Sequence, residues 1–157
     1  MTDHATFMRQ AIALSRIHMS AGAGGPFGAV IVQDGKVVGE GWNKVTSTND
    51  PTAHAEVTAI RDACQRLARF DLRGTVLYTS CEPCPMCLAA TYWARIDKVY
   101  YANEQADAAA INFDDAFLYR QLSIPRERRS LACEQILRDE ALEVFREWDA
   151  KPDKVPY

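Results

Sequence analysis

The sequence predicts an α/β sandwich, in which helices pack on the faces of a β-sheet. Three observations favour this fold: strand-like and helix-like segments alternate along the chain, a hairpin turn separates the first two strands, and helical segments join the later strands. Strands joined by helical crossovers are usually parallel, whereas the strands of a hairpin are antiparallel. We therefore expect a mixed sheet within one domain that spans residues 1–157.

The first part of the chain contains one helix and the hairpin. A helix is expected over 3–20, where apolar residues recur on one face and Asp3 can cap the first turn. Asp34 and Gly35 form a dipeptide that favours a two-residue hairpin turn. The strands on either side of this turn are expected over 27–33 and 36–43.

The rest of the chain alternates between helices and strands after a loop over 44–52. The expected helices cover 53–69, 83–94, about 113–121 and about 139–150, and the expected strands cover 74–80 and 98–102. Pro83 suits a helix start, because the missing N–H of proline costs nothing in the first turn. One face of the last helix is interpreted as core or interface, and it carries Leu142, Phe145 and Trp148.

Composition excludes several classes of protein. The chain is 48% apolar and 25% charged, which is typical of a folded domain and not of a disordered or collagen-like chain. The net charge of −3 argues against a broad polyanion-binding surface, so we expect no nucleic-acid partner. No apolar run approaches the ~20 residues that cross a bilayer, and the N-terminus does not read as a secretory signal. We expect a cytoplasmic protein with no membrane segment.

Cysteine and histidine residues predict a metal site. Five cysteines, three of them within seven residues, indicate metal or redox chemistry in a reducing compartment. Cys84 and Cys87 share the first turn of an expected helix, whose dipole favours the thiolates that zinc requires. His54 opens the preceding helix, and helix N-termini gather at the carboxyl edge of parallel strands. One histidine and two cysteines leave a fourth position of a catalytic zinc open to water.

Glu56 adds the group that moves protons. A carboxylate beside a catalytic zinc takes a proton from the activated water and passes it to the substrate. The pattern H-A-E at 54–56 with P-C-P-M-C at 83–87 is the signature of the zinc nucleobase deaminases. An alternative is a closed structural site that adds Cys81 to the ligands, which would have no catalytic role and no task for Glu56.

Longer stretches resemble the small bacterial guanine deaminases of the cytidine deaminase superfamily. The resembling segments are GGPFGAVIV (24–32), NDPTAHAEVTAIR (49–61), YTSCEPCPMCLAA (78–90), YWAR (92–95) and FDDAFLY (113–119). The first two segments are also shared with transfer-RNA adenosine deaminases, so the preference for guanine depends on YWAR, FDDAFLY and the terminal Tyr157.

The resemblance implies a three-layer α-β-α sandwich with a mixed five-stranded sheet, a cytidine deaminase-like fold with one Zn²⁺ per chain. It also implies a homodimer in which the segment 139–157 is exchanged and covers the partner's site. The implied reaction is hydrolysis of guanine to xanthine and ammonia, in which zinc activates a water molecule and Glu56 shuttles the protons.

The resemblance further implies a set of substrate-binding residues. Phe27 would stack on the base, Asn43 would hold it and Asp115 would hydrogen-bond a ring N–H. The other members of the set are Ala55, Trp93, which would shape the pocket, and Tyr157, which would belong to a lid from the other chain. Simpler roles remain open for Phe27 as strand core, for Asn43 as a turn cap, and for Asp114 or Asp115 as a helix cap.

Three other functions remain open on the sequence. A transfer-RNA adenosine deaminase shares the zinc motif but needs a basic groove for its substrate, which the net charge disfavours. A cytosine or aminotriazine deaminase, with a substrate such as ammeline, fits the same motif. A zinc-stabilised interaction module without activity belongs to a different class, and an open position on the metal would exclude it.

Overall fold

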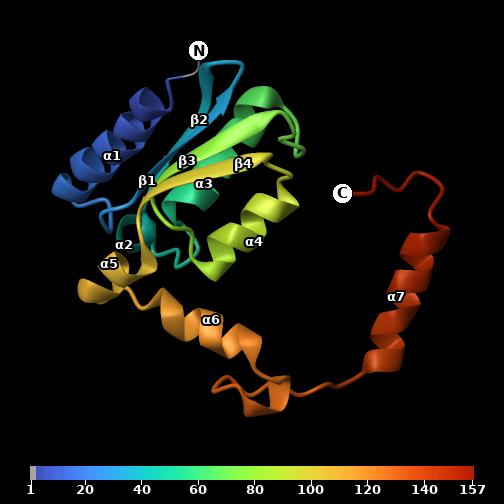
Figure 1. Cartoon of the computed structure of the whole chain (residues 1–157). Coiled ribbons are helices and arrows are strands. Elements are labelled where there is room, and N and C mark those ends of the chain that lie inside the picture. Colours follow the sequence, from blue (N-terminus) through green and yellow to red (C-terminus); the bar gives the residue numbers. More distant parts are fainter. Residues whose placement is uncertain (1–2) are drawn as a thin grey trace. The chain divides into compact units, whose positions relative to one another are not determined.

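The computed structural model describes residues 3–157, which form two compact units, one ending at Leu118 and the other comprising Tyr119–Tyr157. Figure 1 shows the elements in sequence colours. The helices are α1 (His4–Ser20), α2 (Val45–Thr48), α3 (Ala55–Leu67), α4 (Pro85–Trp93), α5 (Gln105–Ala110), α6 (Asp115–Ser123) and α7 (Arg138–Ala150). The strands are β1 (Gly28–Gln33), β2 (Lys36–Trp42), β3 (Thr75–Cys81) and β4 (Lys98–Asn103), and a short 3₁₀ turn covers Arg126–Arg128.

The sheet is mixed and has the strand order β2-β1-β3-β4. β1 is antiparallel to both β2 and β3, and β3 is parallel to β4. β2, β3 and β4 therefore run in one direction, and their carboxyl ends meet at the same edge of the sheet. This edge carries the site described below.

The expectation of a five-stranded sheet is wrong, because the residues that the structure describes form four strands. The chain turns into a helix directly after β4. Glu104 and Asp107 form a capping box, in which each side chain accepts a hydrogen bond from the other residue's backbone N–H. This box starts α5 directly after β4, and the elements that follow in the described chain are helices and a 3₁₀ turn.

Local sequence signals determine the first elements. The Asp3 carboxylate accepts a hydrogen bond from the Thr6 N–H at 3.2 Å and caps α1, as expected. Asp34 and Gly35 both have positive φ values, 49° and 75°, which is the backbone of a type I′ hairpin turn. The expected loop over 44–52 contains a helix that the sequence analysis missed, the four-residue α2.

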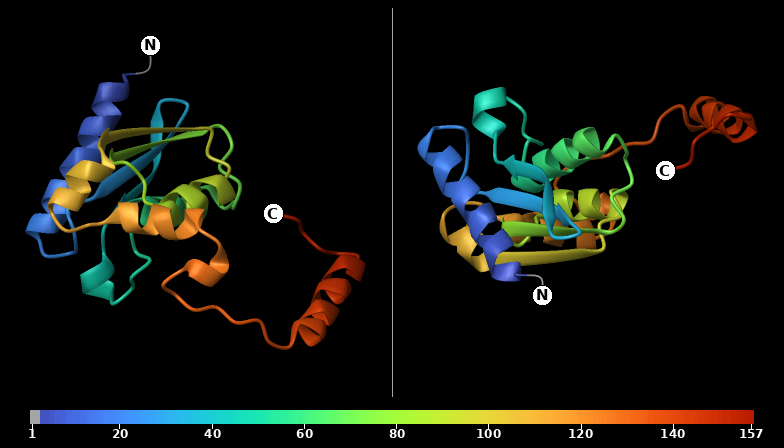
Figure 2. Two further views of the ribbon diagram at one scale, coloured as in Figure 1. Left: turned by 60° about the horizontal axis from the view of Figure 1, so that its bottom comes forward. Right: turned by 90° about the horizontal axis from the view of Figure 1, so that it is seen from above.

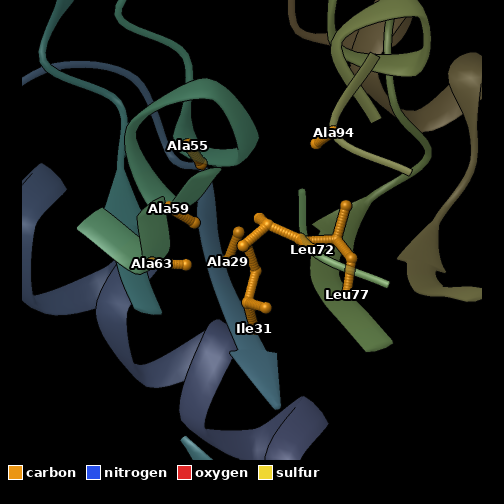
Figure 3. Packing of buried hydrophobic residues seen from close by; sticks show 8 residues of the cluster. All are labelled: Ala29, Ile31, Ala55, Ala59, Ala63, Leu72, Leu77 and Ala94. Atoms are coloured by element: carbon orange, nitrogen blue, oxygen red, sulfur yellow. The ribbon is translucent and has the colours of Figure 1, made fainter. Parts of the chain in front are cut away.

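Helices cover both faces of the sheet, so the expected three-layer sandwich is confirmed (Figures 1 and 2). Alternate residues of β1 point to opposite faces. Val30 and Val32 pack in a cluster with side chains of α1. Ala29 and Ile31 face the small side chains of α3, as Figure 3 shows.

α3 packs unusually close to β2, which brings its first turn to the sheet edge. The buried side chains on this face of the helix are all small: Ala55, Ala59 and Ala63. Gly41 of β2 has no side chain, and a Cβ there would lie 2.2 Å from the Ala55 carbonyl oxygen. A larger residue at position 41 would therefore displace the N-terminus of α3, where the metal-binding sequence begins.

The second unit contains the 3₁₀ turn and α7. Three large apolar side chains of α7 are exposed, Val144, Phe145 and Trp148, and Phe145 has 74% of its surface accessible. In the described part of the chain, every helix is too short or too polar to span a membrane.

Candidate metal centre

Three side chains converge at the carboxyl edge of the sheet, as the sequence predicts. The Nδ1 atom of His54 lies 3.5 Å from the Sγ atoms of both Cys84 and Cys87. The three donor atoms all lie within 4.8 Å of one another. His54 and Cys84 are the N-cap residues of α3 and α4, so the first turns of two helices supply the whole cluster.

Prolines place the two cysteines. The residue before a proline is restricted to extended backbone, and Cys84 precedes Pro85 with φ −64° and ψ 167°. Cys84 therefore lies outside the helix, which begins at Pro85 and not at Pro83 as expected. Cys87 then falls in the first turn, next to Cys84 in space.

The donor separations fit zinc. Tetrahedral zinc with ordinary Zn–N and Zn–S bond lengths holds its nitrogen and sulfur ligands about 3.6 Å apart. The observed separations of 3.5 Å match this geometry for both sulfur atoms. One imidazole and two sulfur atoms are also a ligand set typical of catalytic zinc.

The electrostatics of the cluster favour a cation. Hydrogen bonds with Cys87 and then His54 lower the pKa of Cys84 to about 4. The hydrogen bond to Cys84 raises the pKa of Cys87, because the two sulfur atoms share one proton. The Cys84 thiolate also raises the pKa of His54 through its hydrogen bond. A divalent metal ion would replace these protons and hold both sulfur atoms as thiolates.

Cys81 does not join this group. Its thiol donates to the Glu104 carbonyl oxygen at 3.8 Å, and burial raises its pKa to about 11. Among the described residues, the metal-binding group around His54 consists of three side chains. The geometry therefore favours a three-ligand centre over the closed alternative with a fourth protein ligand.

Glu56 lies beside the cluster on the first turn of α3. Its side chain is 6% exposed, and burial raises the pKa of the carboxyl above its usual range. The Thr79 hydroxyl donates a hydrogen bond to Glu56 Oε1 at 3.0 Å. Within a helix, side chains two residues apart point in nearly opposite directions. His54 is an extended cap residue outside the helix, so this rule does not separate the His54 and Glu56 side chains.

A cavity of about 250 Å³ opens over the cluster. Its walls include the predicted metal ligands His54 and Cys84, the predicted proton shuttle Glu56, and three predicted base-binding residues, Phe27, Asn43 and Asp115. Cys81, the extra ligand of the alternative closed site, also lines the cavity. The sequence analysis missed the other lining residues: Gly25, Val45, Thr46, Pro51, Glu82 and Phe113. Phe113 packs edge-on against Phe27, with ring centroids 4.9 Å apart. Its place directly before the two aspartates could have suggested it.

Asn43 has a fixed orientation at the cavity. Its Oδ1 accepts hydrogen bonds from the backbone N–H groups of Gly25 and Val45, both at 3.1 Å. The turn-capping role and the cavity position therefore coexist. Since the oxygen holds the two loops together, the amide NH₂ is the group that remains for a ligand.

Asp114 and Asp115 have different surroundings. Asp114 Oδ1 accepts a hydrogen bond from the Phe117 N–H at 3.1 Å, which is the contact of a helix cap. Asp115 lines the cavity, and burial and then the Cys84 thiolate raise the pKa of its carboxyl. Of the two aspartates, Asp115 is thus the one that faces the cavity.

Three predicted base-binding residues lie outside the cavity lining. Ala55 is the first residue of α3 and is fully buried in the core. Trp93 is 67% exposed at the end of α4 and borders a separate surface pocket with Tyr92. Tyr157 belongs to the second unit and is exposed. Their predicted contacts with a base remain predictions.

Comparisons with known proteins agree with this centre. A family model described as the cytidine and deoxycytidylate deaminase zinc-binding region matches residues 1–103. Guanine deaminase of Bacillus subtilis (strain 168) is 51% identical over 155 residues, which cover 99% of each chain. The X-ray structure of guanine deaminase from Bacillus subtilis matches with a TM-score of 0.96 over 99% of each chain.

More distant relatives cover less of the chain. A tRNA-specific adenosine deaminase of Agrobacterium fabrum (strain C58 / ATCC 33970) is 41% identical over 113 residues, which cover 71% of this chain and 72% of the relative. A structure of guanine deaminase from Nitrosomonas europaea is 28% identical and has a TM-score of 0.69, covering 96% of this chain and 87% of that chain. The protein belongs to the cytidine and deoxycytidylate deaminase family that is defined by its zinc-binding region.

Proposed function

We propose that this protein hydrolyses guanine to xanthine and ammonia. The observation that carries the proposal is the three-ligand centre with Glu56 beside it, in a chain that is 51% identical to a guanine deaminase over its full length. The cavity of about 250 Å³ is slightly smaller than pockets for drug-sized ligands, which suits a single planar base.

Zinc, one per chain, would be held by His54, Cys84 and Cys87, and when bound it supplies a Lewis acid that makes water a nucleophile at neutral pH. Glu56 takes a proton from the attacking water and delivers it to N3 of guanine. The water oxygen forms a bond to C2. Glu56 then takes the remaining proton from the new C2 hydroxyl and transfers it to the amino group. The C2–N bond breaks as the C2 carbonyl forms, and ammonia leaves.

The cavity walls supply the means to hold a flat, polar base. Phe27 offers a stacking face, and the Asn43 amide offers a donor for an acceptor atom of the base. Asp115 offers an acceptor for a ring N–H. Such pairing is needed because a buried polar group without a partner costs about 1–3 kcal/mol.

Ammonia release from zinc-loaded protein tests the substrate. Guanine, guanosine, cytosine, adenine and ammeline are supplied separately, and we expect release from guanine with little from cytosine and adenine. Protein carrying Glu56→Gln serves as the control for contaminating deaminases. Release from cytosine or ammeline in preference to guanine contradicts the proposal.

A second candidate substrate is adenosine in transfer RNA. It is favoured by the 41% identity to a tRNA-specific adenosine deaminase, although this match covers 71% of the chain. Inosine formation in transfer RNA, together with no ammonia release from any free base, would establish this candidate instead. The net charge of −3 makes the free base the preferred substrate.

We also propose a homodimer in which the segment 139–157 is exchanged, so that Tyr157 completes a lid over the partner's site. The exposed apolar side chains of α7, Phe145 among them, support a partner for this helix. A chain truncated before residue 139 should lose the dimer and the activity together. An active monomeric truncation would refute the exchanged lid.

The cysteines support a cytoplasmic location as a further proposal. All five cysteines are free of disulfide bonds, including the exposed Cys133. Unpaired thiols persist in the reducing cytoplasm, whereas exported proteins usually oxidise them. Fractionation of cells that express the protein tests this location.

A further inference from the structure

Thr79 places a hydroxyl group in the middle of the core. It lies on β3, between Ala29 of β1 and Tyr101 of β4, and is 1% exposed. Strands that are covered on both faces usually carry valine, isoleucine or leucine. A hydroxyl at such a position costs free energy unless it is hydrogen-bonded, so its partner indicates its role.

The partner of this hydroxyl is Glu56. Thr79 Oγ1 donates to Glu56 Oε1 at 3.0 Å, and the contact is buried. The Glu56 carboxylate also interacts with its own backbone N–H and with the Cys87 thiol. Once Cys87 is a thiolate ligand of a metal ion it has no proton to donate. Thr79 is then the side chain that still donates to the carboxylate.

The two side chains differ in stiffness. The last torsion of a glutamate is broad, so the carboxylate is poorly oriented by its own chain. Threonine is branched at Cβ and holds a narrow χ1, and here its backbone is fixed between two neighbouring strands. A hydroxyl on a rigid strand therefore supplies the orientation that the glutamate lacks.

We propose that Thr79 is a positioning residue, whose hydroxyl holds Oε1 of Glu56 so that the carboxylate is oriented for proton transfer. The inference rests on the proposed function, because it assigns Glu56 the proton-shuttle role. Misplacing a reacting group by about 1 Å costs up to about 100-fold in rate. Loss of the hydroxyl should therefore lower turnover while leaving the metal centre and the base-binding walls in place.

Kinetics of Thr79→Val and Thr79→Ser provide the first test. Valine has the shape of threonine without the hydroxyl, and serine keeps the hydroxyl. With zinc bound, we expect Thr79→Val to lower kcat about 10–100-fold with KM within about threefold, and Thr79→Ser to stay within about threefold of wild type. A Thr79→Val kcat within twofold of wild type, or equal losses in both variants, overturns the proposal.

Thr75→Val is the matched control. Thr75 is a second buried threonine of β3, and its hydroxyl donates to the Leu72 carbonyl oxygen at 2.6 Å. This variant loses a buried hydroxyl from the same strand without touching Glu56, so kcat should not change. If Thr79→Val does not fold, the pair Thr79→Ser and Thr79→Ala carries the test, and equal kcat values in that pair overturn the proposal.

A spectroscopic measurement separates this inference from the choice of substrate. Protein labelled with glutamate at the ¹³C carboxyl carbon gives a Glu56 resonance that Glu56→Gln identifies by its loss. We expect this resonance to shift in Thr79→Val and to stay near its wild-type position in Thr79→Ser. An unchanged resonance in Thr79→Val overturns the positioning role. If wild-type protein releases no ammonia from guanine, this result contradicts only the proposed function.

Discussion

Two neighbouring residues of β3 present hydroxyl groups to opposite faces of the sheet. Tyr78 points to the α1 face, where its hydroxyl lies 2.7 Å from His4 Nδ1. Thr79 points to the other face, where its hydroxyl lies 3.0 Å from Glu56 Oε1. Both hydroxyls are paired, but the first pair lies in an aromatic packing cluster and the second lies beside the metal centre.

The difference shows how the fold separates stability from chemistry. On the α1 face the rings of His4, Phe7 and Tyr100 surround Tyr78, and their centroids lie 5.2 to 6.0 Å from that of Tyr78. On the other face the N-termini of α3 and α4 lie at the carboxyl ends of the strands, and charged groups gather there. The same strand therefore supplies packing to one face and positioning to the other.

The largest effect is expected from removing a metal ligand. Cys84→Ala should abolish zinc binding and turnover together, because two ligands remain of a three-ligand centre. Elemental analysis and ammonia release measure the two losses. Cys133→Ala is the control, since Cys133 is an exposed thiol outside the centre and its loss should change neither quantity. Full zinc content in Cys84→Ala would contradict the ligand assignment.

Removing the proton shuttle should have a smaller effect and leave the metal in place. Glu56→Gln keeps the shape of the side chain and should lower kcat about 10²–10⁴-fold, the usual contribution of a general acid–base group. The zinc content should stay at the wild-type value. Near-wild-type turnover in this variant would mean that another group moves the protons.

The two aspartates before Phe117 allow a matched pair of variants. Asp115→Asn should lower kcat/KM about 10–100-fold, because a hydrogen bond to a charged group contributes about 1.5–3 kcal/mol. Asp114→Asn should leave kcat/KM unchanged, because asparagine caps helices as well as aspartate does. Steady-state kinetics on guanine with both variants measure the difference. Equal effects would contradict the separate roles that the cavity lining indicates.

Sequence patterns predicted the metal centre more completely than the cavity around it. The two half-motifs identify His54, Cys84 and Cys87 because ligand spacing and helix starts are local properties. Glu82 reaches the cavity through tertiary packing that no local pattern encodes. Thr79 was missed because a threonine in a strand has an ordinary propensity, and only its buried partner reveals a role.

The sheet shows the same limit of prediction from local sequence patterns. The cap of α1 was predictable from Asp3, and the hairpin turn was predictable from Asp34-Gly35. Both features depend on the local backbone. The number of strands was taken from a resemblance and is wrong by one. The capping box of Glu104 and Asp107 is a local signal that predicts a helix directly after β4.

The smallest effect is expected from Tyr78→Phe, and it tests the comparison of the two faces directly. Removing this hydroxyl should lower the free energy of unfolding by about 0.5–1.5 kcal/mol, the usual contribution of one hydrogen bond, without changing kcat. Urea unfolding and ammonia release on the same preparation measure both quantities. Thr79→Val, in contrast, should lower kcat. If Tyr78→Phe also slowed turnover at full zinc content, the α1 face would contribute to catalysis, and the separation of roles between neighbouring residues of β3 would be wrong.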